Sequence, residues 1–360
     1  MVLHDTNAVG SSSEVRTKVS ELAAFTARVL ESVGLPENDA HAVGSLMAEA
    51  DARGSDGHGV LRLPAYVKRI QAGGLNIHPN MRLLRDEPAT ALLDGDNAMG
   101  HLVMTRAANL AIEKARSCGI GWVGVRNSNH AGPAALYAQM PAAQDMIGLY
   151  IAIGNANHLP PWGGTAMLLS TNPIAIAVPG LRHPSIVLDM ATTNAAYGKV
   201  KVKAQRNEPM PEGWMIDREG KPLTDPKRAH EGFLLPVGGA KGYGLALMFG
   251  LLAGTLNGAA FGKNVIDFNA DFVSKTNTGQ AVVALNIAAF ADVQTFKQNV
   301  DDIWEQMKSS PTMPGFDEVR LPGERSAKIY ADQVANGIVL APALRQSLDE
   351  LADRLQVARL

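Results

Sequence analysis

Two histidines, each in a segment of small or polar residues, are the side chains best suited to proton transfer. His58 stands between two glycines, and His130 follows two asparagines and a serine. An imidazole exchanges a proton near neutral pH, and flanking glycines let a ligand approach closely. Arg62 follows His58 by four residues, and its guanidinium can clamp a carboxylate through two hydrogen bonds. These residues predict proton transfer on a small carboxylate. A capping histidine beside a salt-bridged arginine is the structural alternative.

Polar side chains without charge mark a possible pocket wall. Residues 146–181 contain no Asp, Glu, Lys or Arg, but they contain Asn155, Thr171 and Asn172. Such side chains between buried strands can hydrogen-bond an amide or a hydroxyl. Asn129 lies at the C-terminal end of a predicted strand, where ligands gather in many α/β units. We expect Asn129, Thr171 and Asn172 to contact the substrate; turns in which Asn and Ser cap a helix are the alternative.

Two further segments have the composition of anion sites. Residues 189–192 lie where a predicted strand runs into a helix, and Thr192 or Thr193 could cap that helix, whose N-terminus would attract an anion. A glycine-rich loop that opens an apolar helix carries Lys241, which suits a phosphate. The loop lacks the spacing of a P-loop, so nucleotide hydrolysis is not indicated.

Residues 119–124 match the dinucleotide motif G-x-G-x-x-G, but in the wrong context. In a Rossmann fold the motif follows a strand and opens a helix. Here the preceding pattern is helical and the following one, WVGVRNSN, is that of a strand. Gly119 is better interpreted as a left-handed residue that ends a helix. A nicotinamide nucleotide would therefore bind in another way.

Hydrophobic periodicity and glycine or proline boundaries place the elements that must position these residues. Strands are predicted on both sides of Glu87-Pro88 and at 121–126, 147–153, 174–178, 186–188 and 282–287. The mixture is α+β rather than a regular βαβ alternation. Helices are predicted at 12–34, 36–53, 64–72, 104–117, 131–145, 193–206, 241–257, 292–308 and 340–358.

Composition excludes several classes of protein. A chain of 360 residues suggests two or three domains, and a net charge of -2 gives no basic field for nucleic acid. Residues 242–262 carry no charge, but their six glycines favour a buried core helix over a membrane span. The N-terminus has no apolar signal region, so we expect a cytoplasmic protein. The chain has a single cysteine, Cys118, so it can form neither an internal disulfide nor a zinc site made of thiolates. We expect Cys118 to be buried, and we predict no metal site.

Together these blocks resemble the type 2 malate/L-lactate dehydrogenase family, which includes ureidoglycolate dehydrogenase, sulfolactate dehydrogenase, 2,3-diketogulonate reductase and a cyclic-imine reductase. The matching segments occur in one order from about residue 50 to 325, and with the helical ends they cover nearly the whole chain. They are SDGHGVLRLPAYVKRIQAGGLN, NSNHAG, PPWGG, STNPIAIAVPG, LDMATTNAAYGKV, PEGWMIDREGKPLTDP, LLPVGGAKGYGLAL and VRLPGERS.

The resemblance implies hydride transfer between NAD or NADP and the C2 carbon of a small 2-oxo or 2-hydroxy acid. Reduction of a cyclic imine carboxylate, or a ureidoglycolate- or sulfolactate-type reaction, is the alternative, and a non-catalytic binding protein ranks lower. His58 and His130 match catalytic histidines, without an indication of which is the principal acid, and Arg62 matches a carboxylate anchor. The positions that match cofactor contacts are Asn155, Asp189, Met190, Ala191, Thr192, Lys241, Gly323, Glu324 and Arg325.

The resemblance also implies an architecture. It predicts a non-Rossmann NAD(P)-binding domain with a mixed sheet at 121–289 and a small α/β domain at 76–120 with 290–329. A helical domain at 1–75 with 330–360 is expected to join subunits into a homodimer or a higher oligomer. Relatives often have serine where Asn155 stands and an aromatic residue where Ala131 stands, so the substrate stays open. Lys201, Lys203 and Arg206 could bind the 2′-phosphate of NADP or form a solvated basic face.

Overall fold

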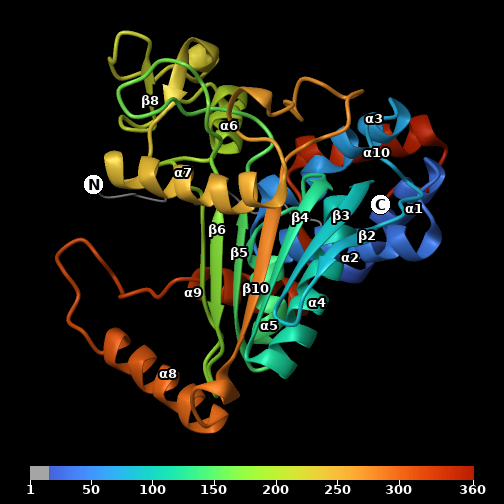
Figure 1. Cartoon of the computed structure of the whole chain (residues 1–360). Coiled ribbons are helices and arrows are strands. Elements are labelled where there is room, and N and C mark those ends of the chain that lie inside the picture. The colour runs from blue at the N-terminus through green and yellow to red at the C-terminus, as the bar shows by residue number, and fades with distance from the viewer. Residues whose placement is uncertain (1–15) are drawn as a thin grey trace.

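The structure, a computed structural model that describes residues 16–360, is built around a seven-stranded sheet (Figure 1). Only β3 and β4 run parallel to each other, and all other neighbouring pairs are antiparallel. The prediction of a mixed sheet in a fold of helices and strands is therefore confirmed. In spatial order the strands are β2 (Arg82–Asp86), β3 (Thr90–Ala98), β4 (Ile120–Ser128), β10 (Gln280–Asn286), β5 (Met146–Ala152), β6 (Ile174–Val178) and β7 (Ile186–Met190).

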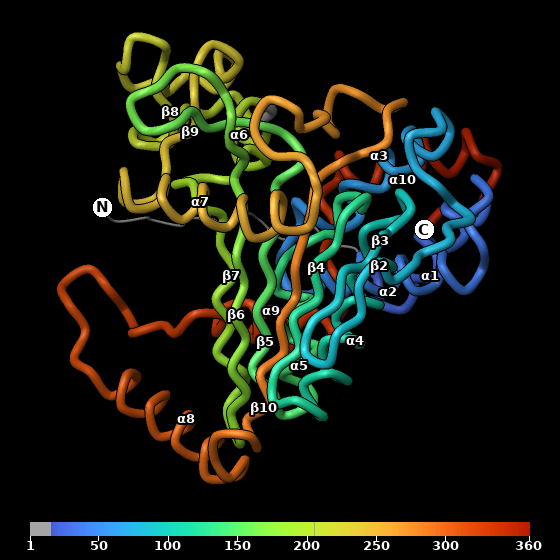
Figure 2. Tube along the Cα trace, viewed as in Figure 1, coloured from blue at the N-terminus to red at the C-terminus, as the bar shows by residue number. Residues whose placement is uncertain are grey.

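The two faces of the sheet pack against different helices. Since side chains alternate along a strand, Val123 and Val125 of β4 join the cluster formed by α4 (Gly100–Cys118) and α5 (Ala135–Ala142). Trp122, directly before Val123, points to the opposite face and joins a cluster with α7 (Ala240–Ala253). In Figures 1 and 2, α7 crosses the sheet at one end, where the polar loops of the predicted site begin and end.

Helix α7 is buried on one side only, which corrects the prediction of a fully buried core helix. Its buried residues are the small ones, Gly242, Ala246, Gly250 and Ala253, which let the backbone approach the sheet closely. Large apolar side chains point the other way, and Met248 is 54% exposed. The absence of charge in this segment therefore reflects a core contact together with an exposed apolar face.

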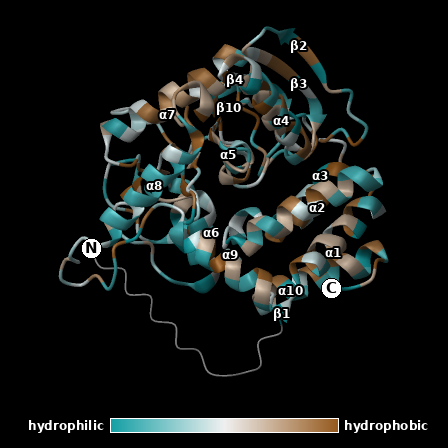
Figure 3. Cartoon of the chain, turned by 90° about the horizontal axis from the view of Figure 1, so that it is seen from below, coloured by the Kyte–Doolittle hydropathy of each residue, from teal (hydrophilic) through white to brown (hydrophobic). Residues whose placement is uncertain are grey.

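The N-terminal helices and the C-terminal helix share one hydrophobic cluster. It contains side chains of α1 (Val19–Ser32), α2 (Glu37–Ala52), α3 (Leu63–Gln71) and α10 (Pro342–Leu355), which lie together in Figure 3. The first helix begins later than predicted, because β1 (Arg16–Thr17) pairs with β11 (Ile338–Val339) and the amide of Lys18 donates to Oε2 of Glu21 at 3.2 Å. Residues 12–15 of the predicted helix lie outside the described residues.

Smaller elements surround the sheet. Helix α6 (Tyr197–Arg206) packs with the hairpin β8 (Met215–Asp217) and β9 (Gly232–Leu234), and α8 (Val293–Lys308) lies at the opposite end of the molecule (Figure 1). Neither the β8–β9 hairpin nor α9 (Glu324–Asn336) was predicted. No helix within residues 16–360 combines the length and the apolar character needed to span a bilayer.

Several predicted boundaries shift. Helix α4 starts earlier, at Gly100, and ends where predicted, at Gly119 with φ 80°. Helix α5 is shorter than 131–145, and α6 starts at Tyr197 instead of 193. Cys118 is exposed rather than buried, with its Sγ 3.3 Å from the carbonyl oxygen of Pro88.

Gly148→Ala is predicted to destabilise the protein, because a Cβ at Gly148 in β5 would overlap the carbonyl oxygen of Ala138 in α5. Backbone cannot move aside cheaply, so we expect a loss of about 3 kcal/mol in the free energy of unfolding, measured by urea denaturation. Gly244→Ala is the matched control. A Cβ there meets nothing within 4 Å, so alanine should stabilise α7 by up to about 1 kcal/mol. Equal stability of the two variants would contradict the close packing of α5 on the sheet.

Candidate active site

The structure brings the two predicted histidines together. The rings of His58 and His130 lie parallel, with their centroids 5.6 Å apart and their planes at 5°. His58 ends a short 3-10 turn (Asp56–His58) after α2, and His130 lies in the loop after β4. Two segments that are distant in the sequence therefore supply one pair of imidazoles.

A buried carboxyl group holds the loop that carries His58. Asp51, in the last turn of α2, accepts a hydrogen bond of 2.8 Å at Oδ2 from the amide of Val60. Gly59 makes room for it, because a Cβ there would overlap the Asp51 carboxyl group. The glycine after His58 thus accommodates a protein side chain and not a ligand, which corrects that interpretation. Gly57, in contrast, faces open space.

Asn129 anchors the loop that carries His130. Its side chain is fully buried, and its Nδ2 donates to the backbone oxygens of Asn97 and Ala98 at 3.0 and 2.9 Å. Both hydrogens of the Asn129 side-chain amide therefore bond to the C-terminal end of β3. These contacts position the neighbouring histidine, whereas Oδ1 of Asn129 has no hydrogen-bond partner among the described residues, and the substrate contact of Asn129 stays a prediction.

Tyr66 fixes the ring of His130. Its hydroxyl lies 2.5 Å from Nδ1 of His130, and the amide of Gly132 donates to the same nitrogen at 3.4 Å. Because a backbone amide can only donate, this network assigns Nδ1 as the acceptor and puts the proton of the neutral ring on Nε2. Tyr66 lies in the matching segment SDGHGVLRLPAYVKRIQAGGLN but was assigned no role; it follows Arg62 by four residues at the start of α3, and that spacing could have revealed it.

Phe268 packs against the same ring and was also missed. Its ring lies 5.8 Å from that of His130 at 30°, and its amide donates to the carbonyl oxygen of Asn155 at 2.8 Å. Asn155 is thereby placed beside the histidine pair, and its Nδ2 donates to the hydroxyl of Thr278 at 2.8 Å.

Both imidazoles are neutral at pH 7. Burial, and then the charge of Arg62, lower the pKa of His58 to about 4. Burial, followed by the charges of Arg62 and His58, holds the pKa of His130 well below its usual range. Burial raises the pKa of Tyr66, so that its hydroxyl keeps its proton. The pair can therefore act through an N–H donor and a basic nitrogen without carrying a charge in the resting state.

Arg62 supplies a charge without a protein counter-ion. Its Nε donates to the carbonyl oxygen of Gly57 at 2.8 Å, and no carboxylate in the described part of the chain forms an ion pair with it. The alternative of a salt-bridged arginine is therefore wrong. Since Arg62 affects the pKa of His58, of His130 and of Tyr66, its guanidinium lies within electrostatic reach of all three.

The predicted anion segments also meet. Thr192 donates to the carbonyl oxygen of Thr171 through its amide and hydroxyl, at 2.9 and 2.8 Å, and accepts from the amide of Val237 at 3.0 Å. The 189–192 segment therefore lies beside the glycine-rich loop. Neither threonine caps α6, which corrects that prediction: Thr193 donates to Ala195, and α6 begins after Ala196 without a side-chain cap.

Asn172 joins α7 to the loop after β5. Its Oδ1 accepts from the amide of Gly154 at 3.2 Å, and its Nδ2 donates to the carbonyl oxygen of Ala246 at 2.7 Å. The side chain is fully buried and bonded at both ends, so it positions this loop, and its predicted substrate contact stays a prediction. Thr171 is half-buried, and its predicted substrate contact stays a prediction.

Asp189 lies at the start of α5, where its Oδ2 accepts from the amide of Ala135 at 2.9 Å. Asp189 is an exposed residue of β7, and desolvation of its carboxyl group raises its pKa to about 6. Met190 and Ala191 continue the chain from there towards Thr192 and are half-buried.

The Gly323–Arg325 segment lies against β7 and the His58 loop. A Cβ at Gly323 would crowd the backbone of Val187. Glu324 forms ion pairs with Lys308 and Lys328, each at 2.9 Å. Burial alone would raise the pKa of Glu324, but the hydrogen bonds from these lysines lower it to about 2. Its carboxylate thus forms ion pairs with both lysines, and the expected cofactor contact of Glu324 stays a prediction. Arg325 is exposed, and its charge opposes the effect of burial on the pKa of Asp56.

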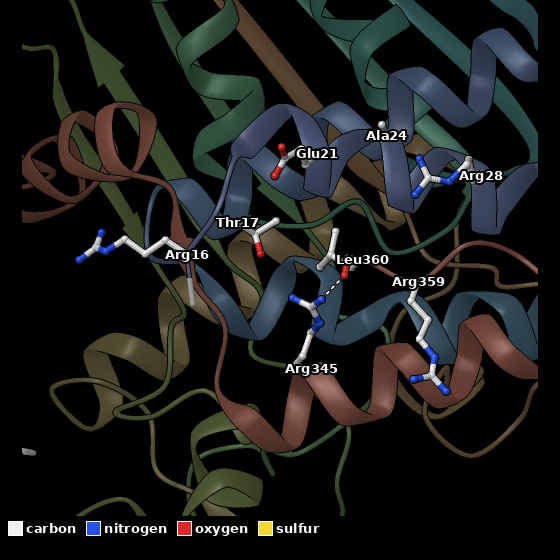
Figure 4. A pocket seen from close by; sticks show the side chains of 8 residues that line it. All are labelled: Arg16, Thr17, Glu21, Ala24, Arg28, Arg345, Arg359 and Leu360. Atoms are coloured by element: carbon white, nitrogen blue, oxygen red, sulfur yellow. Dashed lines mark hydrogen bonds between the residues drawn. The ribbon is translucent and has the colours of Figure 1, made fainter. Parts of the chain in front are cut away.

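A separate hollow of about 400 Å³ lies among the terminal helices (Figure 4). It is lined by arginines of β1, α1 and α10, and Arg345 donates to the carbonyl oxygen of Leu360. None of its lining residues belongs to the histidine site. No cluster of three potential metal ligands occurs within residues 16–360.

Comparisons with known proteins agree on one family. The model of the malate/L-lactate dehydrogenase family matches residues 17–349. The malate dehydrogenase of Pyrococcus abyssi is 39% identical over 352 residues, covering 95% of this chain and 96% of the relative. The L-sulfolactate dehydrogenase of Methanocaldococcus jannaschii is 39% identical over 296 residues, covering 82% and 85%. The solved malate dehydrogenase of Pyrococcus horikoshii OT3 superposes with a TM-score of 0.89 at 35% identity, covering 98% and 99%.

Asp51→Asn is predicted to make stability less dependent on pH. Burial raises the pKa of Asp51 from 3.8 to about 8, so between these values the folded state holds a proton that the unfolded state has lost. Wild-type stability therefore falls as the pH rises through this window, by at most about 1.4 kcal/mol per unit. Asparagine keeps the acceptor for Val60 and cannot ionise.

We expect the difference in melting temperature between Asp51→Asn and wild type to shift in favour of the variant as the pH rises from 5 to 8. Calorimetry measures both melting temperatures. Asp302→Asn, at an exposed position in α8, is the control and should show no such trend. An Asp51→Asn effect of the same size at both pH values would rule out the titration.

Proposed function

Because this chain belongs to the malate/L-lactate dehydrogenase family, we propose that His58, His130 and Arg62 form its active site. The protein is an oxidoreductase that acts on 2-hydroxy acids, and nicotinamide dependence is typical of its family. The observation that carries the site assignment is the stacked imidazole pair beside an arginine that has no protein counter-ion. Residues with this chemistry suit the interconversion of a 2-hydroxy and a 2-oxo acid.

Arg62 anchors the substrate carboxylate. Its Nε is occupied by Gly57, so its terminal nitrogens are the donors for the substrate. An anion bound there also offsets the charge that lowers the pKa of His58. Substrate binding therefore makes His58 more basic at the moment when a proton has to be moved.

The two histidines take different roles. His130 has Nδ1 occupied by Tyr66 and Gly132, so its neutral ring donates from Nε2 to the oxygen on C2 and polarises the carbonyl group. His58 is not fixed in this way and exchanges the proton: it removes the hydroxyl proton in oxidation and returns it in reduction.

The residues around the start of α7 fit a nucleotide cofactor, NAD or NADP. Gly238 has φ 62° and faces open space, and the first amides of α7 have no side-chain cap. Such amides bind a phosphate, and the exposed Lys241 adds a positive charge. We assign Asn155, Asp189, Met190, Ala191, Thr192, Lys241, Gly323 and Arg325 to this site. When bound, the nicotinamide accepts or supplies the hydride.

An oligomer is supported by the exposed apolar side of α7. Leu245, Met248 and Leu251 recur along it at helical spacing, and they are 42%, 54% and 37% exposed. We propose that this face takes part in a homodimer contact. The division into three domains and the contact through the terminal helices stay predictions.

Addition of NADH or NADPH is predicted to change the fluorescence of Trp162 and to raise the melting temperature. Trp162 is 58% exposed and lies next to Gly239 at the start of α7. At 100 times Kd, binding stabilises the folded state by about 2.7 kcal/mol. Trp162→Phe should remove the fluorescence change and keep the thermal shift, whereas Trp304→Phe, in α8, should keep both. Neither signal with either cofactor would contradict the proposed site.

His58→Ala is predicted to lower kcat at least about 100-fold, because the proton transfer loses its acid and base. Turnover of 2-hydroxy and 2-oxo acids is followed at the nicotinamide absorbance band. His78→Ala, at an exposed position, is the control and should be fully active. Near-normal turnover of the His58 variant would refute the assignment.

A further inference from the structure

Arg69 of α3 is a buried guanidinium without a carboxylate partner. Its side chain is 0% exposed, and it forms no ion pair in the described part of the chain. Its terminal nitrogens donate instead to the backbone carbonyl oxygens of Asp271 and Ser274. Its Nε is also buried and has no hydrogen-bond partner within residues 16–360. Because a buried charge without a partner is costly, packing alone does not account for an arginine at this position.

These two bonds fasten the segment 268–276 to α3. Figure 1 shows that the chain between α7 and β10 reaches over to this helix. At the far end of the segment, the hydroxyl of Thr276 donates to the carbonyl oxygen of Ser128, the last residue of β4, at 2.6 Å. Gly74, shortly after α3, lies against its middle, because a Cβ there would overlap the carbonyl oxygen of Phe272. The segment is therefore in close contact with the end of α3.

Phe268, the first residue of this segment, connects Arg69 with His130. Its buried ring lies 4.8 Å from Cζ of Arg69 and 5.8 Å from the imidazole ring. Arg69 follows Arg62 and Tyr66 at the spacing of one helical face. One face of α3 therefore carries the proposed carboxylate anchor, the partner of the histidine Nδ1 and a clamp for the aromatic ring that packs on the same histidine.

From these contacts we propose that Arg69 is a positioning residue of the reaction, which holds Phe268 against His130 and keeps water away from that part of the imidazole. The inference rests on the proposed function, in which His130 donates from Nε2 as a neutral ring. When the clamp is lost, the segment moves off α3, and the imidazole loses both its fixed orientation and its dry surroundings. A misplacement of about 1 Å in such a group can cost 100-fold in rate.

The charged and titratable groups that face His130 remain when Arg69 is replaced. They are Arg62, His58, Tyr66 and His101. Burial has a larger effect on the pKa of His130 than any of these charges. Hydration of the ring should therefore raise the pKa of His130 towards its usual range, even though its charged neighbours are unchanged.

The test measures the pKa of His130 by ¹⁵N NMR in the free enzyme, together with kcat and KM for oxaloacetate and pyruvate. Arg69→Met should raise this pKa and lower kcat about 10- to 100-fold. KM should change little, because Arg62 is intact. Arg69→Lys keeps a donor for one of the two carbonyl oxygens and should therefore recover part of both losses. The control is Arg106→Met, which removes an exposed arginine of α4 that donates to the carbonyl oxygen of Met81 at 3.1 Å, and it should match wild type.

Gly74→Ala tests the same clamp with the arginine in place. Its Cβ would push Phe272 and the segment away from α3, so the pKa of His130 should rise and kcat should fall as in Arg69→Met. If Arg69→Met does not fold, Arg69→Lys and Gly74→Ala decide the question.

An unchanged pKa of His130 in these variants would overturn the inference. An effect on the melting temperature alone would also overturn it, because it would assign Arg69 a purely structural role. Failure of the proposed function looks different, since wild type would then reduce neither acid with either cofactor, while the NMR measurement would still test the clamp.

Discussion

The uncompensated charge of Arg62 beside two buried imidazoles is the interaction on which the active site depends. Within residues 16–360 no carboxylate pairs with this guanidinium, and its field lowers the pKa of His58 and of His130. In a dry site a charge of this kind acts far more strongly than in water. The resting site is therefore a positive charge next to two neutral rings, and binding of a carboxylate changes all three groups at once. When the substrate carboxylate binds Arg62, the same charge that holds the substrate also makes His58 a stronger base.

Buried polar side chains hold the loops that carry Arg62 and the two histidines. Asp51 fixes the His58 loop, Asn129 fixes the His130 loop, and Asn172 ties α7 to the loop after β5. Each of these side chains bonds to backbone groups, which sets the direction of a loop more firmly than packing alone. Helix α7, whose small residues allow close approach to the sheet, then brings the glycine-rich loop next to Thr192. Residues that are far apart in the sequence meet at one end of the sheet because these anchors fix the loops between the strands.

The sequence predicted what depends on local pattern. Most helices and strands, the helix end at Gly119 and the residue types of the site follow from periodicity, glycine positions and resemblance to a family. The sequence could not predict the hydrogen-bond partners of polar side chains, because these partners come from distant parts of the chain. Asn129 and Asn172 have the chemistry of ligand contacts, yet each donates its side-chain amide to backbone oxygens that are remote in the sequence. Tyr66 and Phe268 were missed for the same reason, because only the folded chain brings them to His130.

NMR titration of ¹⁵N-labelled histidines tests the central claim most directly, because nitrogen shifts report both the charge and the tautomer of each ring. The account predicts His130 as the neutral Nε2–H tautomer across the neutral range and His58 with a pKa far below 6.5 in the free enzyme. Oxamate, a carboxylate analogue, added with the cofactor should raise the pKa of His58, and Arg62→Leu should raise it without oxamate. A His58 that titrates near 6.5 and responds to neither change would contradict the account.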